Sequence, residues 1–192
     1  MGAPARITVS WRPSETTLAR GATYDDLYSS FRWSVPDRLN ISAQVCDTWA
    51  IADPGRTAII DLSDGTPHHV NYRDLWALSR QVQGALEAHG VMQGDRVGVL
   101  LSQSALLAAA HIAAWRMGAI SVPLFTLFQR DALASRLGDS GANVVVTDSN
   151  GVEMLAPFNL TALTEADLPD STQAAPLVET TPETPAVLIY TS

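Results

Sequence analysis

The last residues of the sequence are the first candidates for chemistry, because an apolar run ends there in two hydroxyl side chains. Residues 186–190 read Ala-Val-Leu-Ile-Tyr, a pattern typical of a buried strand, and Thr191 and Ser192 follow directly. Ligands of α/β proteins gather at the carboxyl ends of parallel strands, where hydroxyls and backbone amides can surround a polyphosphate. Many ordinary turns begin in the same way. This feature alone therefore leaves a phosphate loop and a simple turn both open.

A second candidate is Ser140, because residues 138–141 read Gly-Asp-Ser-Gly, as around the nucleophile of chymotrypsin-like proteases. The tetrapeptide falls where a helix is expected to turn into a strand, and Gly, Asp and Ser are common in such turns. The chain also lacks the pattern of a β-barrel. We therefore expect no protease site here.

The histidines and the single cysteine have structural explanations. His68 and His69 are adjacent on an expected strand and would point to opposite faces, which disfavours a shared metal. His111 lies in a strongly apolar helix and is expected to be a hydrogen-bonded core residue, and His89 lies near a helix C-terminus. Cys46, the single cysteine, excludes an internal disulfide and is expected to be a small buried residue.

The elements that must position these residues follow from apolar periodicity and from capping signals. Asn71 with Asp74 indicates a helix start, and Gly90 its end. The sequence predicts helices at 41–52, at 71–89, from Ser102 or Ser104 to Met117, and at 131–137, and strands at 57–61, 69–72, 97–101, 120–124, 144–147 and 186–190. The first of these helices should turn Ile41, Val45, Trp49 and Ala52 inward. Residues 148–185 are looser and form an expected connecting stretch with, at most, short elements of its own.

The alternation of strands and helices predicts the fold class: α/β, with a doubly wound, mostly parallel sheet and helices on both faces. Two regions are expected. Residues 1–40 form an irregular, aromatic segment packed on the domain, and residues 41–192 form the α/β domain itself.

Composition excludes several function classes. The 192 residues include 20 acidic and 12 basic side chains, for a net charge of −8, so general electrostatic binding of nucleic acid or an anionic membrane is disfavoured. The longest apolar run, 105–115, is too short to span a bilayer, and the first residues show no secretory signal. We expect a cytoplasmic protein.

Five stretches in order resemble the adenylate-forming superfamily of acyl-CoA synthetases, luciferases and peptide-synthetase adenylation domains. Residues 188–192, Leu-Ile-Tyr-Thr-Ser, look like the opening of its Tyr-Thr-Ser-Gly-Thr-Thr-Gly phosphate loop. Residues 115–124 resemble its earlier motif of an apolar helix, a Gly-Ala turn and a strand closing in Val-Pro-Leu. Three further stretches agree in order and spacing: 71–75, 94–101 and 139–148.

The resemblance covers about residue 40 to Ser192 and implies the N-terminal part of an AMP-forming acyl-CoA synthetase, ending inside the phosphate loop. Such an enzyme would use ATP, Mg²⁺ and CoA to activate a fatty or short- to medium-chain carboxylic acid. It implies Thr191 and Ser192 as ATP-binding residues, with no catalytic residue and no metal ligand assigned. It also implies that these 192 residues alone have no ligase activity.

Two alternatives to this interpretation stay open, and the sequence argues against a third. The chain could be a non-catalytic module that keeps the fold to bind a partner, or an adenylation domain that loads a carrier protein instead of CoA. A dinucleotide-binding domain would need Gly-x-Gly-x-x-Gly after its first strand, but Ser-Gln-Ser-Ala follows Leu101. The sequence leaves the oligomeric state open.

Overall fold

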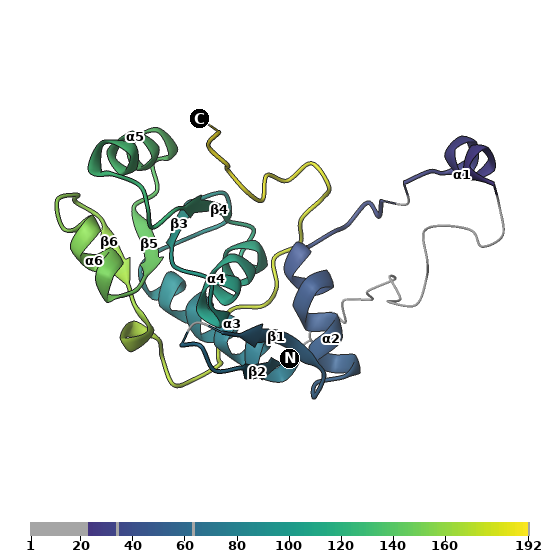
Figure 1. Cartoon of the computed structure of the whole chain (residues 1–192), viewed down its shortest axis with the longest axis horizontal. Helices are drawn as coiled ribbons and strands as arrows, with labels where there is room; N and C mark the ends of the chain where they lie inside the picture. Colours follow the sequence, from purple (N-terminus) through teal and green to yellow (C-terminus); the bar gives the residue numbers. More distant parts are fainter. Residues whose placement is uncertain (1–22, 34, 63, 192) are drawn as a thin grey trace, which may run out of the picture.

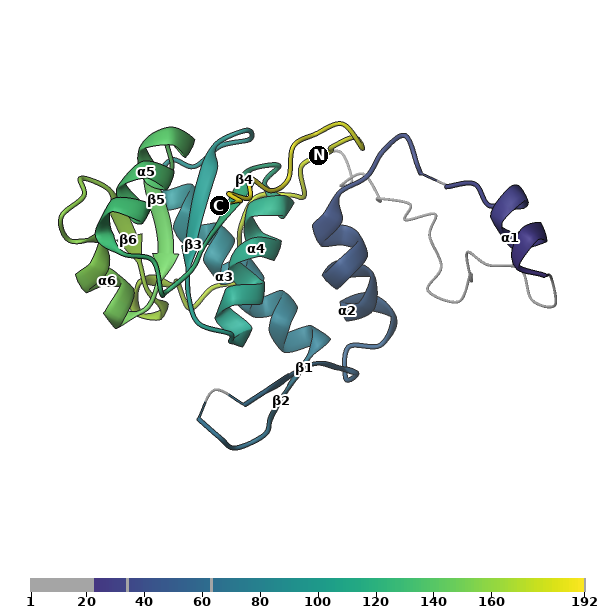
Figure 2. The ribbon, with the colours of Figure 1, turned by 45° about the horizontal axis from the view of Figure 1, so that its top comes forward.

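The computed structural model describes residues 23–191 except Ser34 and Ser63. It contains a small antiparallel hairpin and a four-stranded parallel sheet with helices on both faces (Figures 1 and 2). In chain order the elements are α1 (Tyr24–Ser30), a π-helical turn (Ala43–Asp47), α2 (Thr48–Ala52), β1 (Thr57–Asp61), β2 (His68–Asn71), α3 (Tyr72–Ala88), β3 (Arg96–Leu100), α4 (Ala105–Arg116), β4 (Ile120–Leu124), α5 (Arg130–Ser140), β5 (Val144–Thr147), α6 (Ser149–Leu155), β6 (Thr161–Leu163) and a 3₁₀ turn (Glu165–Asp167).

The large sheet has the strand order β4-β3-β5-β6, and each neighbouring pair is parallel. Val97 of β3 is the partner of Ser121 on one side and of Val144 on the other. The chain leaves β3 for β4 at one side and returns to β5 at the other side of β3. This reversal confirms the predicted doubly wound α/β fold.

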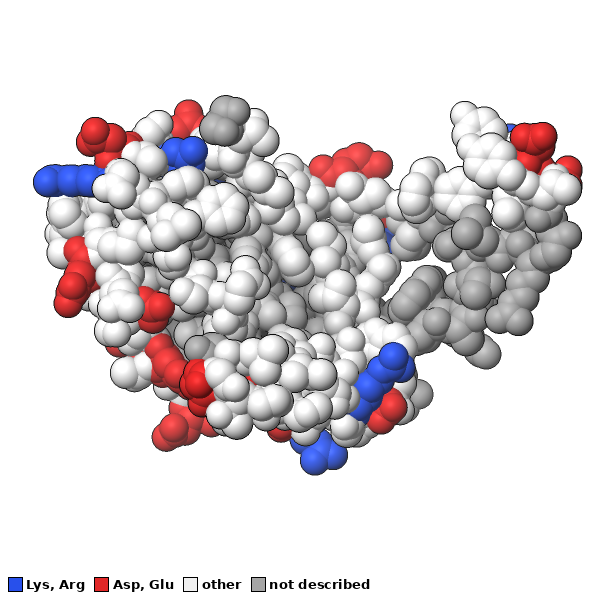
Figure 3. All heavy atoms as spheres, in the orientation of Figure 1, with Lys and Arg blue, Asp and Glu red and all other residues white. Residues whose placement is uncertain are grey.

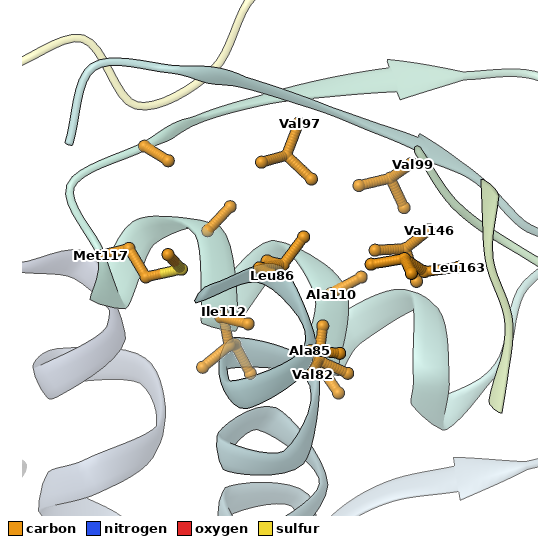
Figure 4. Packing of buried hydrophobic residues seen from close by; sticks show 14 of the residues in the cluster. Val82, Ala85, Leu86, Val97, Val99, Ala110, Ile112, Met117, Val146 and Leu163 are labelled. Atoms are coloured by element: carbon orange, nitrogen blue, oxygen red, sulfur yellow. The ribbon is translucent and has the colours of Figure 1, made fainter. Parts of the chain in front are cut away.

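Two apolar clusters cover the two faces of the sheet. On the first face α3 and α4 pack against β3, β5 and β6, as Figure 4 shows for part of this cluster. On the second face α5 and α6 pack against β4 and β5. The buried residues labelled in Figure 4 are Val82, Ala85, Leu86, Val97, Val99, Ala110, Ile112, Met117, Val146 and Leu163.

Capping explains where the two long helices begin and end. The Asn71 side chain accepts a hydrogen bond from the Asp74 amide at 2.9 Å, and Gly90 follows the end of α3 with a φ of 77°. That positive φ suits glycine, which has no Cβ to clash. Ser104 caps α4 by accepting from the Leu107 amide at 3.2 Å. The sequence left Ser102 and Ser104 open, and Ser104 is the cap.

The helical region at 41–52 forms as predicted, but its buried face is different. Ser42, Ala43 and Cys46 are buried, whereas Val45 is 42% exposed. The prediction assumed regular α-helical spacing, and a π-helical turn at Ala43–Asp47 makes that spacing wrong, since its wider turn rotates the inward face.

The predicted strand at 186–190 is wrong as a full strand, because only Val187 pairs with β4. The Ser121 amide donates to the Ala186 carbonyl, and the Leu188 amide donates to the Ser121 carbonyl, both at 2.9 Å. In a parallel ladder the next bond would come from the amide of residue 123. Pro123 has no N–H, so the pairing stops there.

The N-terminal segment expected to pack on the domain lies partly outside the described residues. Within the described part, α1 has no buried residue. The C-terminal end of the N-terminal segment is hydrogen-bonded to the domain. The Leu39 amide donates to the Thr180 carbonyl and the Asn40 side chain donates to the Val178 carbonyl, both at 2.9 Å. None of the helices that the structure describes is both long and apolar enough to cross a membrane.

Candidate functional site

The segment that carries Thr191 runs beside β4 in the same direction, because Val187 pairs with Ser121 in parallel. Its C-terminal end therefore points toward the edge of the sheet where the four strands have their carboxyl ends. Thr191 is exposed there, and Ser192 lies outside the described residues. The structure thus brings one of the two predicted site residues to the edge where ligands of open α/β sheets bind.

Tyr190, directly before Thr191, is held against α5. Its hydroxyl donates a hydrogen bond to the Asp139 carboxylate at 2.6 Å. The Arg136 guanidinium lies 5.7 Å from the centre of the Tyr190 ring and 4.2 Å from that of Phe128. The hydrogen bond to Asp139 is the main cause that raises the pKa of the Tyr190 phenol, because ionisation would remove the proton that this bond donates. Sequence reasoning missed this arrangement.

The crevice between β3 and β5 is the topological switch point of the sheet. The polar side chains beside it serve local structure. Thr147 donates its hydroxyl hydrogen bond to the Leu100 carbonyl at 2.8 Å, and Asp148 accepts from the Gly151 amide at 2.9 Å as the cap of α6. Asp61 of the hairpin accepts from the Ala105 amide at 3.1 Å and so ties the hairpin to the start of α4. The side chains of Thr147, Asp148 and Asp61 beside this crevice are therefore engaged in structural hydrogen bonds.

The face seen in Figure 3 is uncharged in its centre, and its acidic and basic side chains gather around the rim. Exposed apolar side chains near the carboxyl edge of β4 include Phe125, Leu127 and Ile189, with exposed fractions of 62%, 88% and 67%. A phosphate bound at the centre of this face would meet no basic patch and would rely on backbone amides and hydroxyls.

The Gly-Asp-Ser-Gly tetrapeptide does not form a nucleophilic site. Ser140, the last residue of α5, is 6% exposed, and its hydroxyl donates to the Leu137 carbonyl at 3.4 Å. The Asp139 carboxylate accepts the hydrogen bond of the Tyr190 hydroxyl. Both side chains therefore have structural partners, which agrees with the expectation from sequence.

Three of the histidines lie in different elements: His68 in β2, His89 at the C-cap of α3 and His111 in α4. His68 pairs with Asp64 at 2.9 Å in the hairpin, and His89 contacts the Ala85 carbonyl through Nδ1 at 2.9 Å. His111 stacks on Trp115 with 5.7 Å between ring centres, and burial lowers the pKa of its imidazole. Its Nδ1 is buried without a hydrogen-bond partner, so the hydrogen bond expected for this core histidine does not form at that atom. Among the described residues, no group of three or more His, Cys, Asp or Glu could hold a metal ion.

Cys46 is fully buried in the main core. Burial, with the neighbouring Asp47 charge adding to it, raises the pKa of its thiol to about 12. A thiol that stays protonated is a poor nucleophile, so the structural interpretation of this residue holds.

Comparison with known proteins places this architecture in a family. The curated human protein "Acetyl-coenzyme A synthetase 2-like, mitochondrial" is 33% identical over 155 residues, which is 79% of this chain and 22% of that protein. The acetyl-coenzyme A synthetase of Aeromonas salmonicida is 31% identical over 146 residues, again 22% of its length. This chain therefore spans about a fifth of these relatives. A crystal structure of Brucella canis acyl-CoA synthetase superposes with a TM-score of 0.75 at 28% identity, covering 88% of this chain and 36% of that one.

The family model described as "AMP-binding enzyme" matches residues 46–192, which is most of the chain and includes the parallel sheet and the segment before Thr191. Since both the sequence and the fold agree with this match, the chain belongs to the AMP-binding enzyme family.

Proposed function

We propose that this chain forms the N-terminal part of an AMP-forming acyl-CoA synthetase and begins its ATP phosphate loop at Thr191 and Ser192. The observation that supports this proposal most strongly is the family match over residues 46–192, which ends at a segment running toward the ligand-binding edge of a doubly wound sheet.

The reaction has two steps that balance without a redox partner. A carboxylate oxygen of the substrate attacks the α-phosphate of ATP, which forms an acyl-adenylate and releases pyrophosphate. The sulfur of CoA then attacks the acyl carbonyl, which forms the thioester and releases AMP and a proton. Thr191 and Ser192 would contribute hydroxyl and backbone N–H donors to the phosphates, where negative charge develops in the first step.

Mg²⁺, when bound, would neutralise part of the phosphate charge. No group of three or more His, Cys, Asp or Glu in the described part of the chain could hold it, so we assign no Mg²⁺ ligand here.

For the substrate we propose a short- to medium-chain carboxylic acid, with CoA as the acyl acceptor. The relatives cited above carry the name acetyl-coenzyme A synthetase, which supports a small acyl group. Residues 123–128, Pro-Leu-Phe-Thr-Leu-Phe, also favour acyl-CoA synthetases over peptide-synthetase domains. A carrier-protein-loading adenylation domain and a non-catalytic binding module remain the competing functions.

The test is carboxylate-dependent exchange of labelled pyrophosphate into ATP, measured with acetate, butyrate and octanoate. It should be run on the 192-residue chain and on the protein made from the complete native reading frame that contains it. We expect exchange only from the latter and acyl-CoA formation when CoA is added. Exchange without acyl-CoA would favour the carrier-protein function. A complete product that catalyses no exchange with any carboxylate would contradict the proposal.

Two variants and a matched control test the residues themselves. Thr191→Ala and Ser192→Ala in the complete protein should lower kcat for exchange, since each removes a donor near the phosphates. Thr184→Ala, in the preceding segment, should leave kcat unchanged. Equal activity of all three variants would remove Thr191 and Ser192 from the ATP site.

A further inference from the structure

Pro123 limits the backbone hydrogen bonds between β4 and the segment that leads to Thr191. The ladder between this segment and β4 ends at the bond from the Leu188 amide to the Ser121 carbonyl. Pro123 cannot donate the next bond, so the backbone after Leu188 loses its regular partner in the sheet. The start of a phosphate loop must nevertheless be held within a fraction of an ångström to be useful. Something other than the ladder has to fix it.

Tyr190 supplies such a fixation through its side chain. Its hydroxyl donates to Asp139 of α5 at 2.6 Å, across 51 positions of sequence, and its ring lies over the Arg136 guanidinium. Leu188 and Tyr190 also pack against the second apolar cluster. The hydrogen bond of the Tyr190 side chain therefore fixes the chain one residue before Thr191, after the last backbone hydrogen bond to β4.

Arg136 adds a second constraint on the same ring. Its guanidinium lies over the rings of Phe128 and Tyr190, at 4.2 Å and 5.7 Å from their centres, and Nη1 donates to the Ala132 carbonyl at 3.1 Å. A cation over an aromatic face is attracted to the electrons of the ring. α5 thus presents a carboxylate to the Tyr190 hydroxyl and a cation to the Tyr190 ring.

We propose that Tyr190 and Asp139 form a positioning pair that anchors the start of the ATP phosphate loop to α5, with Arg136 orienting the Tyr190 ring. Neither residue contacts ATP in this proposal. They act through the placement of Thr191 and Ser192, and the inference rests on the function proposed above.

The pair itself can be tested in the 192-residue chain without any activity. The Tyr190 phenol is followed by its near-ultraviolet phenolate absorbance, taken as the difference between the wild type and Tyr190→Phe. We expect ionisation above the usual range of tyrosine in the wild type, and a return toward that range in Asp139→Asn. Asp131→Asn, an exposed acid in the first turn of the same helix, is the matched control. An unchanged titration in Asp139→Asn would overturn the pair.

The positioning role is tested in the complete protein by steady-state kinetics. Tyr190→Phe and Asp139→Asn should each lower kcat/KM for ATP about three- to tenfold, the factor that one typical hydrogen bond represents. The double variant should lose no more than either single one. KM for the carboxylate and the melting temperature should change little, which a general loss of structure would not allow. Additive losses, or equal losses for both substrates, would overturn the role.

Pro123 allows a sharper version of the same test. Pro123→Ala restores an N–H at the position where the ladder stops, so the backbone could continue its pairing with the segment. In the Pro123→Ala background, Tyr190→Phe should lower kcat/KM for ATP by a smaller factor than it does in the wild type. An equal factor in both backgrounds would contradict the proposal that the Tyr190–Asp139 pair replaces the missing backbone bonds. If the wild-type protein itself catalyses no exchange, both the proposed function and the positioning role are wrong. The phenol titration still decides whether Tyr190 and Asp139 form the pair.

Discussion

Arg116, the last residue of α4, donates a hydrogen bond to the carboxylate of Asp47, which lies in the helical turn before α2. The two side chains are 9% and 15% exposed. The same carboxylate accepts from the Trp76 indole at 2.9 Å and from the Ser42 hydroxyl at 3.0 Å. Asp47 therefore joins α2, α3 and α4 through one group. A nearly buried charge needs such partners, because leaving it unpaired in a low dielectric is costly.

The first prediction concerns this junction. Asp47→Ala should lower the free energy of unfolding by about 3–5 kcal/mol, since it leaves the Arg116 charge buried and unpaired. Urea denaturation followed by circular dichroism measures the change. Asp53→Ala, an exposed acid at the end of the same helical region, is the control and should change stability by less than about 0.5 kcal/mol. Equal stability of the two variants would show that the junction contributes nothing.

The second prediction concerns the close packing of β3 and β5. A Cβ at Gly98 would lie 2.8 Å from Val145 Cγ2 and 3.4 Å from Leu124 Cδ1, on the face covered by α5 and α6. Gly98→Ala should therefore lower the free energy of unfolding by about 1–3 kcal/mol through overpacking. Gly138→Ala in α5 meets nothing within 4 Å and should be neutral or slightly stabilising. A stabilising Gly98→Ala would contradict the packing described here.

Local signals explain why most of the fold could be predicted from sequence. Asn71, Ser104 and Gly90 act through their own backbone neighbours, so their effect is visible in a single chain. The apolar runs of β3 and β5 are buried on both faces and were found for that reason. By contrast, β6 has only three residues, and α6 has seven with Gly151 inside it. Elements that short carry too little periodicity to be recognised.

The candidate site was predictable only where a motif is contiguous. Thr191 and Ser192 follow directly from the strand-like run before them. The bond between Tyr190 and Asp139 joins residues 51 positions apart, and no local pattern links them. The early end of the last strand was also missed, because it depends on which side of β4 the missing N–H of Pro123 faces. Both are tertiary facts that the order of residues does not express.

The third prediction concerns the connecting stretch that leads back to β4. Arg80 of α3 donates to the carbonyls of Thr172, Ala174 and Ala175 at 3.2, 2.6 and 2.7 Å. Arg80→Met keeps the stem of the side chain but removes all three bonds. We expect faster amide hydrogen exchange in residues 172–178 with little change in the central strands.

Arg73→Met is the control for that experiment, because Arg73 is exposed on the same helix. It should leave exchange in 172–178 as in the wild type. The free energy of unfolding should fall by about 0.5–1.5 kcal/mol in Arg80→Met, the net worth of a typical hydrogen bond, because Thr172 and Ala174 are half-buried and Ala175 is exposed, so water can replace part of the lost bonding. Unchanged exchange in the stretch would show that Arg80 does not hold it.

The last prediction is a pH dependence that originates in α4. Burial lowers the pKa of His111 below the 6.5 of an exposed imidazole. The unfolded chain therefore binds this proton more readily than the folded chain does, so protonation favours unfolding. The stability that depends on neutral His111 is fully present above pH 6.5 and is lost as the pH falls through the lowered pKa. His111→Gln should accordingly show a smaller drop in melting temperature between pH 7.5 and pH 5 than the wild type, as measured by calorimetry. His69→Gln, exposed on β2, should keep the wild-type drop. An equal drop in wild type and His111→Gln would mean that other groups govern the acid sensitivity.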